Sequence, residues 1–277
     1  MARPVTPLGI AAAMLRDLVA DAEASTLSSS SDFLGRLKHA SELIGGLESY
    51  VDQRTSHASE RLQRLADRTS KHDWQKSFHI GETSIELEQE MLSGHAEGEF
   101  LKMLVAATKA QSILEIGMFT GYGTLAMAEQ LPEDGRIIAL EYDAFVANFA
   151  MESFQQSGIA EKIDVRVGPA AESLQSLIAE GKRFDFVFLD ADKSGYRDYL
   201  ETLLASKLLT DDALICVDNT LLQGEPYCKT KAASASGMAI ADFNDFVSMR
   251  PDLHHVLIPI RDGVTLIRRH DTPADAR

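Results

Sequence analysis

The segment at residues 112–123 constrains the fold more than any other part of the chain. It begins with a short apolar run at 112–116, continues through a turn that contains Gly117, Gly121 and Gly123, and leads into an expected helix. Glycine has no Cβ, so the backbone can turn sharply there and approach a ligand closely. A strand, a glycine-rich turn and a helix in this order are typical of a doubly wound α/β sheet that binds a nucleotide-like ligand at the turn.

The spacing of these residues favours a nucleoside ligand that has no diphosphate. Glu141 closes the next apolar run, 24 positions after Gly117, about where a doubly wound fold binds a ribose. The glycines follow the pattern Gly-x-x-x-Gly-x-Gly, and Phe119 stands where a dinucleotide pyrophosphate needs bare backbone. S-adenosylmethionine is the commonest nucleoside of this kind. An ordinary buried strand and turn is the alternative interpretation.

Composition excludes some partners. The 277 residues carry a net charge of −15, which opposes binding to nucleic acid or to an anionic membrane surface. The two cysteines, Cys216 and Cys228, are expected to be free thiols in a reducing compartment. No run approaches the length of a membrane span and the N-terminus does not resemble a signal peptide, so we expect a cytoplasmic protein.

The chain divides into three expected parts. Residues 1–90 are predicted to be a helical cap or dimerisation segment, whose first helix is capped by Thr6 and begins at Pro7. Residues 81–108 are expected to form a helix pair that breaks near Gly94. An α/β domain is expected at 91–270 and a disordered polar tail at 271–277. We expect a homodimer.

Alternating strands and helices after residue 112 predict a mostly parallel, seven-stranded, doubly wound sheet with both faces covered. The expected strands are 112–116, 136–140, 163–167, 184–189, 213–217, 255–259 and 264–268, and the expected helices between them include 145–156, 172–179, 196–204 and 238–248. Only 260–263 links the last two strands, so they should form an antiparallel hairpin.

Polar residues stand where two of these strands end. Asp190 follows strand 184–189, and Asp218 and Asn219 follow strand 213–217. If the strands are neighbours, two carboxylates and an amide oxygen converge in a set suited to Mg²⁺ or Ca²⁺, with Mn²⁺ a further possibility. Lys193 can turn back toward the same place, where a divalent cation would favour its neutral amine and suit it to act as a general base. Helix caps and a solvated lysine are the alternative interpretations.

Three segments carry a resemblance to a known family, in the right order: 114–122 (LEIGMFTGY), 189–193 (LDADK) and 217–219 (VDN). Over about residues 91–269 the chain resembles the cation-dependent class I O-methyltransferases, which include the catechol and caffeoyl-CoA enzymes. The resemblance implies a Rossmann-like methyltransferase fold and transfer of a methyl group from S-adenosylmethionine to one hydroxyl of a small vicinal diol.

The same resemblance implies a role for each matching residue. Asp190, Asp218 and Asn219 correspond to the metal ligands, and Lys193 to the catalytic base. The residues that correspond to the cofactor-binding set are Met91, Glu115, Gly117, Thr120, Gly121, Tyr122, Gly123, Glu141, Tyr142, Pro169, Ala170, Ala171 and Asp190. Within that set Glu141 would bind the ribose, Met91 would border the reactive methyl, and 169–171 would contact the adenine through backbone amides. Asp192 replaces a substrate-facing tryptophan of the catechol enzymes.

A closer likeness covers nearly the whole chain. Segments 2–7, 87–95, 216–224 and 259–263 resemble the O-methyltransferases of mycosporine biosynthesis, which form 4-deoxygadusol from its demethyl precursor. A catechol or caffeoyl-type phenol is the alternative acceptor. A nucleotide-dependent dehydrogenase and a non-catalytic interaction protein are the rival functions.

Overall fold

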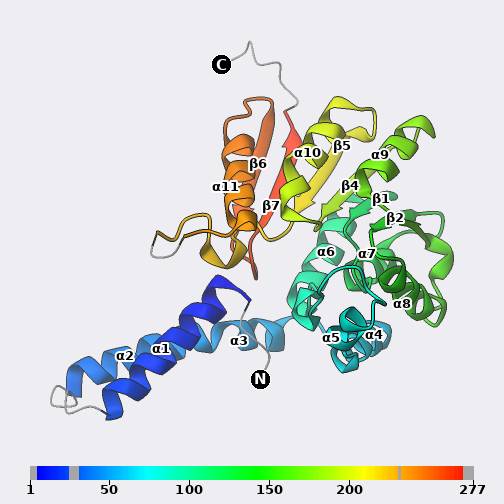
Figure 1. The fold of residues 1–277 in the computed structure, drawn as a ribbon. Coiled ribbons are helices and arrows are strands. Elements are labelled where there is room, and N and C mark those ends of the chain that lie inside the picture. Colours follow the sequence, from blue (N-terminus) through cyan, green and yellow to red (C-terminus); the bar gives the residue numbers. More distant parts are fainter. Residues whose placement is uncertain (1–4, 25–30, 230–231, 271–277) are drawn as a thin grey trace.

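A computed structural model describes residues 5–24, 31–229 and 232–270 (Figure 1). Seven strands form one sheet in the order β3-β2-β1-β4-β5-β7-β6. The strands are β1 (Ser112–Ile116), β2 (Arg136–Glu141), β3 (Ile163–Val167), β4 (Phe184–Leu189), β5 (Leu209–Val217), β6 (Leu253–Ile258) and β7 (Val264–Arg269). The first five pair in parallel, whereas β7 lies antiparallel to both β5 and β6. The predicted doubly wound sheet and its C-terminal hairpin are confirmed.

The largest difference from the predicted strands is at β5. β5 begins at Leu209, four residues before the expected start. The ladder between β4 and β5 shifts register between Phe184 and Phe186, which lets Leu209 pair with Phe184 and adds the exposed Asp211 and Asp212 to the strand. Two consecutive acidic residues interrupt the apolar pattern, so a prediction based on apolar runs starts the strand too late.

Helices cover both faces of the sheet. The helices are α1 (Pro7–Ala24), α2 (Ser31–Gly45), α3 (Leu47–Arg54), α4 (Glu60–Lys71), α5 (Trp74–His79), α6 (His95–Thr108), α7 (Tyr122–Gln130), α8 (Ala144–Gln155), α9 (Ala170–Ala179), α10 (Tyr196–Ala205) and α11 (Ala235–Ser248). Helices α9, α10 and α11 pack on one face of the sheet, and α6 and α7 pack on the other, with α4 and α8 beside them. The predicted two-face cover is therefore present.

The N-terminal helices form two groups. Helices α1 and α2 pack against each other as a hairpin that projects from the body of the protein (Figure 1). As predicted, Thr6 caps α1, because its hydroxyl accepts a hydrogen bond from the backbone N–H of Gly9 at 3.0 Å. Helix α4 joins the core instead, burying Leu62 and Leu65 against α7 and α8.

The expected helix pair at 81–108 is wrong in its first half. Only α6 is a full helix there, and residues 81–94 form turns and a 3₁₀ segment, η2 (Gln89–Met91). Gly81 and Gly94 have φ of 78° and 82°, which breaks the helix at both ends of this stretch. The predicted tail at 271–277 lies outside the described residues. In the part of the chain that is described, no helix has the length and apolar character needed to cross a membrane.

Gly117 offers a direct test of this fold. Its φ is 89°, and a Cβ at this position would come within 2.1 Å of the backbone oxygen of Asp190. We expect Gly117→Ala to lower the free energy of unfolding by about 2 kcal/mol or more, because a backbone atom cannot move aside cheaply. Thermal or urea unfolding measures the loss.

Gly35→Ala is the matched control, because Gly35 lies exposed in α2 with nothing near its missing Cβ. We expect that change to leave the stability unaltered or to raise it slightly, since alanine favours a helix. Equal stability of the two variants would contradict the assigned contact at Gly117.

Candidate active site

A cavity of about 840 Å³ opens beyond the carboxyl ends of the central strands. Gly117 follows β1, Glu141 ends β2, Asp190 follows β4 and Asp218 follows β5, and all four residues line this cavity. In an open α/β sheet the ends of the parallel strands form the usual ligand site. β4 pairs with β5. This confirms the prediction that the strands before Asp190 and Asp218 are neighbours in the sheet.

One half of the cavity surrounds Glu141. Its carboxylate is buried and accepts hydrogen bonds from the backbone N–H groups of Phe119 (2.8 Å) and Asp143 (2.9 Å). Burial raises the pKa of Glu141, and these backbone hydrogen bonds oppose the rise. Tyr142, Gly168 and the start of α9 complete this wall, including Pro169, Ala170 and Ala171. The structure therefore gathers the residues expected at the ribose and adenine.

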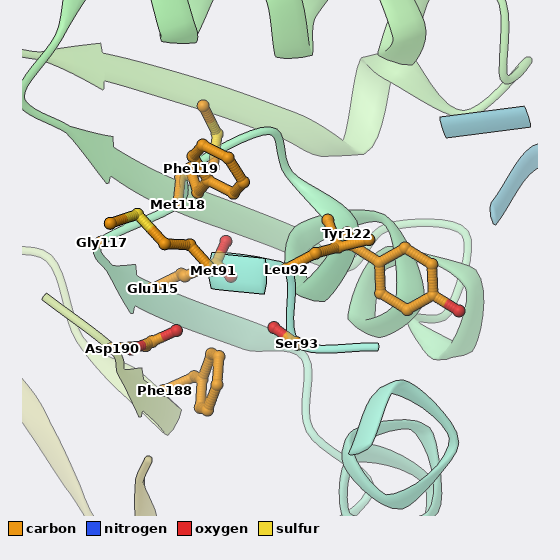
Figure 2. A pocket seen from close by; sticks show the side chains of 10 residues that line it. All are labelled: Met91, Leu92, Ser93, Glu115, Gly117, Met118, Phe119, Tyr122, Phe188 and Asp190. Carbon is orange, nitrogen blue, oxygen red and sulfur yellow. The ribbon is translucent and has the colours of Figure 1, made fainter. Parts of the chain in front are cut away.

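Met91, Gly117 and Asp190 line the cavity and also a small adjoining pocket, which Figure 2 shows. In that view the side chain of Met91 extends toward Gly117. Glu115, in β1, lines the small pocket but not the cavity. Glu115 is buried, and its carboxylate accepts a hydrogen bond from the hydroxyl of Thr124. Burial is the main reason that the pKa of Glu115 is raised.

Four predicted residues have mainly structural surroundings. The buried hydroxyl of Thr120 contacts that of Thr69 at 2.9 Å, and the space beside Gly121 is filled by Phe154. Gly123 leaves room for Glu115. None of these three lines the cavity, and Tyr122 points away from Asp190 in Figure 2.

The other half of the cavity brings together the predicted ligand-type oxygens. The ammonium of Lys193 donates hydrogen bonds to Asp190 Oδ1 at 2.9 Å, to Asn219 Oδ1 at 2.5 Å and to the Tyr196 hydroxyl at 2.8 Å. The carboxylate and the amide oxygen therefore converge on one positively charged atom. A hard divalent cation needs this kind of donor set, so the residues present fit such an ion.

Asp218 stands beside these oxygens and is 4% exposed. Burial and the charge of Asp190 raise the pKa of Asp218 to about 7, which the nearby Lys193 opposes. Among the described residues, no three Asp, Glu, His or Cys side chains form a metal cluster by themselves.

Sequence reasoning missed three charged residues of this half: Glu97, Arg261 and Asp262. Asp262 accepts hydrogen bonds from the backbone N–H of Gln223 at 2.6 Å and from Asn219 Nδ2 at 3.4 Å, which turns Asn219 Oδ1 toward Lys193. Because β7 runs antiparallel to β5, the link before β7 must lie at the carboxyl end of β5. The predicted hairpin could therefore have indicated that Arg261 and Asp262, which lie in this link, are close to the site.

Comparison with known proteins identifies the family. The family model described as O-methyltransferase matches residues 56–270. The chain belongs to this O-methyltransferase family.

Relatives and solved structures agree with that family. The chain is 35% identical over 217 residues to caffeoyl-CoA O-methyltransferase 1 of Eucalyptus globulus (76% of this chain, 82% of the relative). It is 37% identical over 220 residues to that of Zea mays (76% and 78%). The S-adenosylhomocysteine-bound Podospora anserina methyltransferase PaMTH1 superposes with a TM-score of 0.71 at 25% identity (83% and 96%). The O-methyltransferase TomG of Streptomyces achromogenes, in complex with S-adenosylmethionine, gives 0.67 at 26% (81% and 96%).

These findings confirm the predicted enzyme class, an S-adenosylmethionine-dependent O-methyltransferase with a Rossmann-like fold. The dehydrogenase alternative is wrong.

The raised pKa of Asp218 predicts how stability depends on pH in metal-free protein. Its folded-state value of about 7 exceeds that of an unfolded aspartate, about 3.9, so the folded state binds more protons between these values. The stability that this proton contributes is complete below about pH 4 and is lost as the pH rises through 7. In EDTA we expect Asp218→Asn to unfold at a higher temperature than the parent protein at pH 8, and the difference to shrink toward pH 5.

Asp212→Asn is the control, because Asp212 lies on the same strand with its side chain 90% exposed. Its effect on the unfolding temperature should be small at both pH values. A difference between Asp218→Asn and the parent that did not change with pH would contradict the raised pKa.

Proposed function

We propose that this enzyme is a divalent-cation-dependent O-methyltransferase that acts on a small molecule with two adjacent oxygens. The observation that carries the proposal is the convergence of Asp190 Oδ1 and Asn219 Oδ1 on one ammonium group, in the same cavity as Glu141 and Gly117. A place for a cation thus lies beside a place for a nucleoside. The two reactants of a methyl transfer would be held next to each other, and such positioning supplies much of the rate acceleration.

The donor would lie along the half of the cavity that runs from Gly117 to Ala171. Glu141 would accept hydrogen bonds from the ribose hydroxyls, and the backbone at 169–171 would contact the adenine. The S-adenosylhomocysteine bound by PaMTH1 and the S-adenosylmethionine bound by TomG support this placement, since both share the fold. Met91 would then border the sulfonium methyl above Gly117.

Asp190, Asp218 and Asn219 would hold the cation, with Mg²⁺ the first ion to test and Ca²⁺ or Mn²⁺ as alternatives. Bound there, a divalent ion lowers the pKa of an acceptor hydroxyl and fixes its orientation. In the structure the Lys193 ammonium donates hydrogen bonds to the side-chain oxygens of Asp190 and Asn219. Once freed from them, its neutral amine would be placed to accept the hydroxyl proton, while the acceptor oxygen attacks the methyl group and S-adenosylhomocysteine leaves.

The walls of the acceptor half include residues specific to this chain. Val5 and Thr6 line the cavity, although they precede the region matched by the family model, and the Thr6 hydroxyl is fixed by a hydrogen bond to Glu48. Asp192 accepts a hydrogen bond from the Tyr199 hydroxyl at 2.7 Å, so a polar pair stands where the catechol enzymes carry tryptophan. Because the chain resembles the O-methyltransferases of mycosporine biosynthesis, we propose demethyl-4-deoxygadusol, a cyclohexenone with adjacent enol oxygens, as the acceptor.

A caffeoyl-type phenol is the second candidate. The curated relatives named above are caffeoyl-CoA O-methyltransferases, and the chain is 35–37% identical to them. Both acceptors present two neighbouring oxygens, so the cation site serves either one. Val5, Thr6 and Asp192, which line the cavity, would determine which of the two acceptors is preferred.

An acceptor screen tests the function. Labelled S-adenosylmethionine is incubated with the enzyme and demethyl-4-deoxygadusol, caffeoyl-CoA or catechol, each with EDTA and with added Mg²⁺. We expect transfer to demethyl-4-deoxygadusol with the highest kcat/KM, and loss of transfer in EDTA that Mg²⁺ restores. Full activity in EDTA would overturn the cation-dependent mechanism, and a preference for caffeoyl-CoA would replace the proposed acceptor by the second candidate.

Two variants test the proposed roles of Asp218 as a cation ligand and Lys193 as a base. We expect Asp218→Ala to lower kcat/KM by about 100-fold or more, because even indirect partners of a metal site cost 10–100-fold when removed. Lys193→Ala should cost only about tenfold, since an acidic enol needs less help from a base than an ordinary hydroxyl.

Lys207→Ala is the control for loss of a positive charge, because Lys207 is exposed beyond α10. It should leave kcat/KM unchanged. Equal losses for Lys193→Ala and Asp218→Ala, or a larger loss for Lys193→Ala, would contradict the assigned roles.

A further inference from the structure

Glu97 is a buried carboxylate that the proposed mechanism does not use. It lies in the first turn of α6, is 1% exposed and lines the acceptor half of the cavity. Its Oε2 pairs with Nε of Arg261 at 3.3 Å, whereas its Oε1 has no hydrogen-bond partner among the described residues. An unpartnered buried carboxylate oxygen is costly, so this atom marks a place where a donor or a cation belongs.

The residues around Glu97 indicate what kind of group could bind its Oε1. Its side chain is within hydrogen-bonding reach of Asp218, and the charges of Asp218 and Asp190 both act on it. Two carboxylates have only acceptor atoms when both are ionised, so they repel each other unless a donor or a cation lies between them.

Acidic side chains outnumber cationic ones around the acceptor half of the cavity. Its lining includes the carboxyl groups of Glu97, Asp190, Asp192, Asp218 and Asp262, and the two cationic side chains Lys193 and Arg261. An excess of acidic groups in a largely buried site favours binding of a cation.

We propose that Glu97 is a positioning residue for the cation, and that its Oε1 accepts a hydrogen bond from a water molecule bound to that ion. This inference rests on the proposed function. Mg²⁺ takes six oxygen ligands and usually keeps water among them. Asp190, Asp218 and Asn219 would supply three of these ligands, which leaves room for water. Arg261 holds the other oxygen of Glu97, so the carboxylate keeps its orientation.

A contact through water agrees with the geometry better than direct ligation. Glu97, Asp190 and Asp218 do not gather into a three-carboxylate metal cluster in the described part of the chain. Partners that act through a ligand or a bound water typically change metal affinity by about 10- to 100-fold. Glu97 should therefore tune the affinity without being required for the fold.

The test measures metal binding directly, on the full chain saturated with S-adenosylhomocysteine and without acceptor. Mg²⁺ is titrated by calorimetry, and Mn²⁺ by loss of the free-ion paramagnetic resonance signal. We expect Glu97→Gln to weaken binding of both ions by about 10- to 100-fold. Glu97→Asp keeps the charge but withdraws it by one methylene, and we expect a smaller loss.

Glu99→Gln is the matched control on the same helix. Glu99 pairs with Lys102 at 2.8 Å and does not line the cavity, so its removal should leave both affinities unchanged. Thermal unfolding in EDTA checks that every variant is folded. If Glu97→Gln does not fold, Glu97→Asp carries the test alone.

The outcomes separate this inference from the proposed function. A parent protein that binds neither ion overturns both. A parent that binds Mg²⁺, together with Glu97 variants that bind it equally well, overturns the role of Glu97 only. Unchanged metal affinity with a raised KM for the acceptor, measured in the methyl-transfer assay described above, would place Glu97 against the acceptor. Unchanged affinity with lowered stability would make it a structural ion pair. Either result overturns the inference.

Discussion

The active-site region depends on backbone hydrogen bonds that continue the parallel ladder one residue beyond the strands. Gly117 N–H donates to Leu140, Asp190 N–H donates to Ile116, and Asp218 N–H donates to Leu189, at 2.8–3.0 Å. These bonds fix the first residue after each strand as firmly as the strand itself. The side chains of Asp190 and Asp218 therefore leave a rigid edge, and their separation does not depend on flexible loops. Precise sites are best built on such rigid elements.

Burying several acidic groups at this edge creates the central energetic problem of the molecule. A carboxylate taken out of water is destabilised unless a cation or hydrogen-bond donors compensate it. Asp190 is compensated by Lys193, and Glu97 by Arg261. Asp218 accepts a backbone hydrogen bond from Asn219 at 2.6 Å, and burial beside Asp190 raises its pKa. Either a proton or a bound cation can therefore compensate the carboxylate of Asp218.

The sheet could be predicted from the sequence because its information is local. Apolar runs, glycines with positive φ and the short link before β7 each act over a few residues, and each gave the right element. Asp190, Asp218 and Asn219 followed from the same logic, since consecutive parallel strands end at one edge. The acidic start of β5 and the irregular stretch at 81–94 were not predictable in this way, because tertiary contacts override local pattern there.

Glu97 shows most clearly what the sequence conceals. It shares one face of α6 with Leu101 and Val105, and all three are buried, so the helical spacing alone marks it as a charge on an apolar face. Which groups compensate that charge depends on Arg261, which is 164 positions further along the chain and meets Glu97 only because β7 reverses direction next to β5. A charged residue on an apolar helix face therefore indicates that some group compensates its charge. The topology of the sheet is needed to identify that group as Arg261.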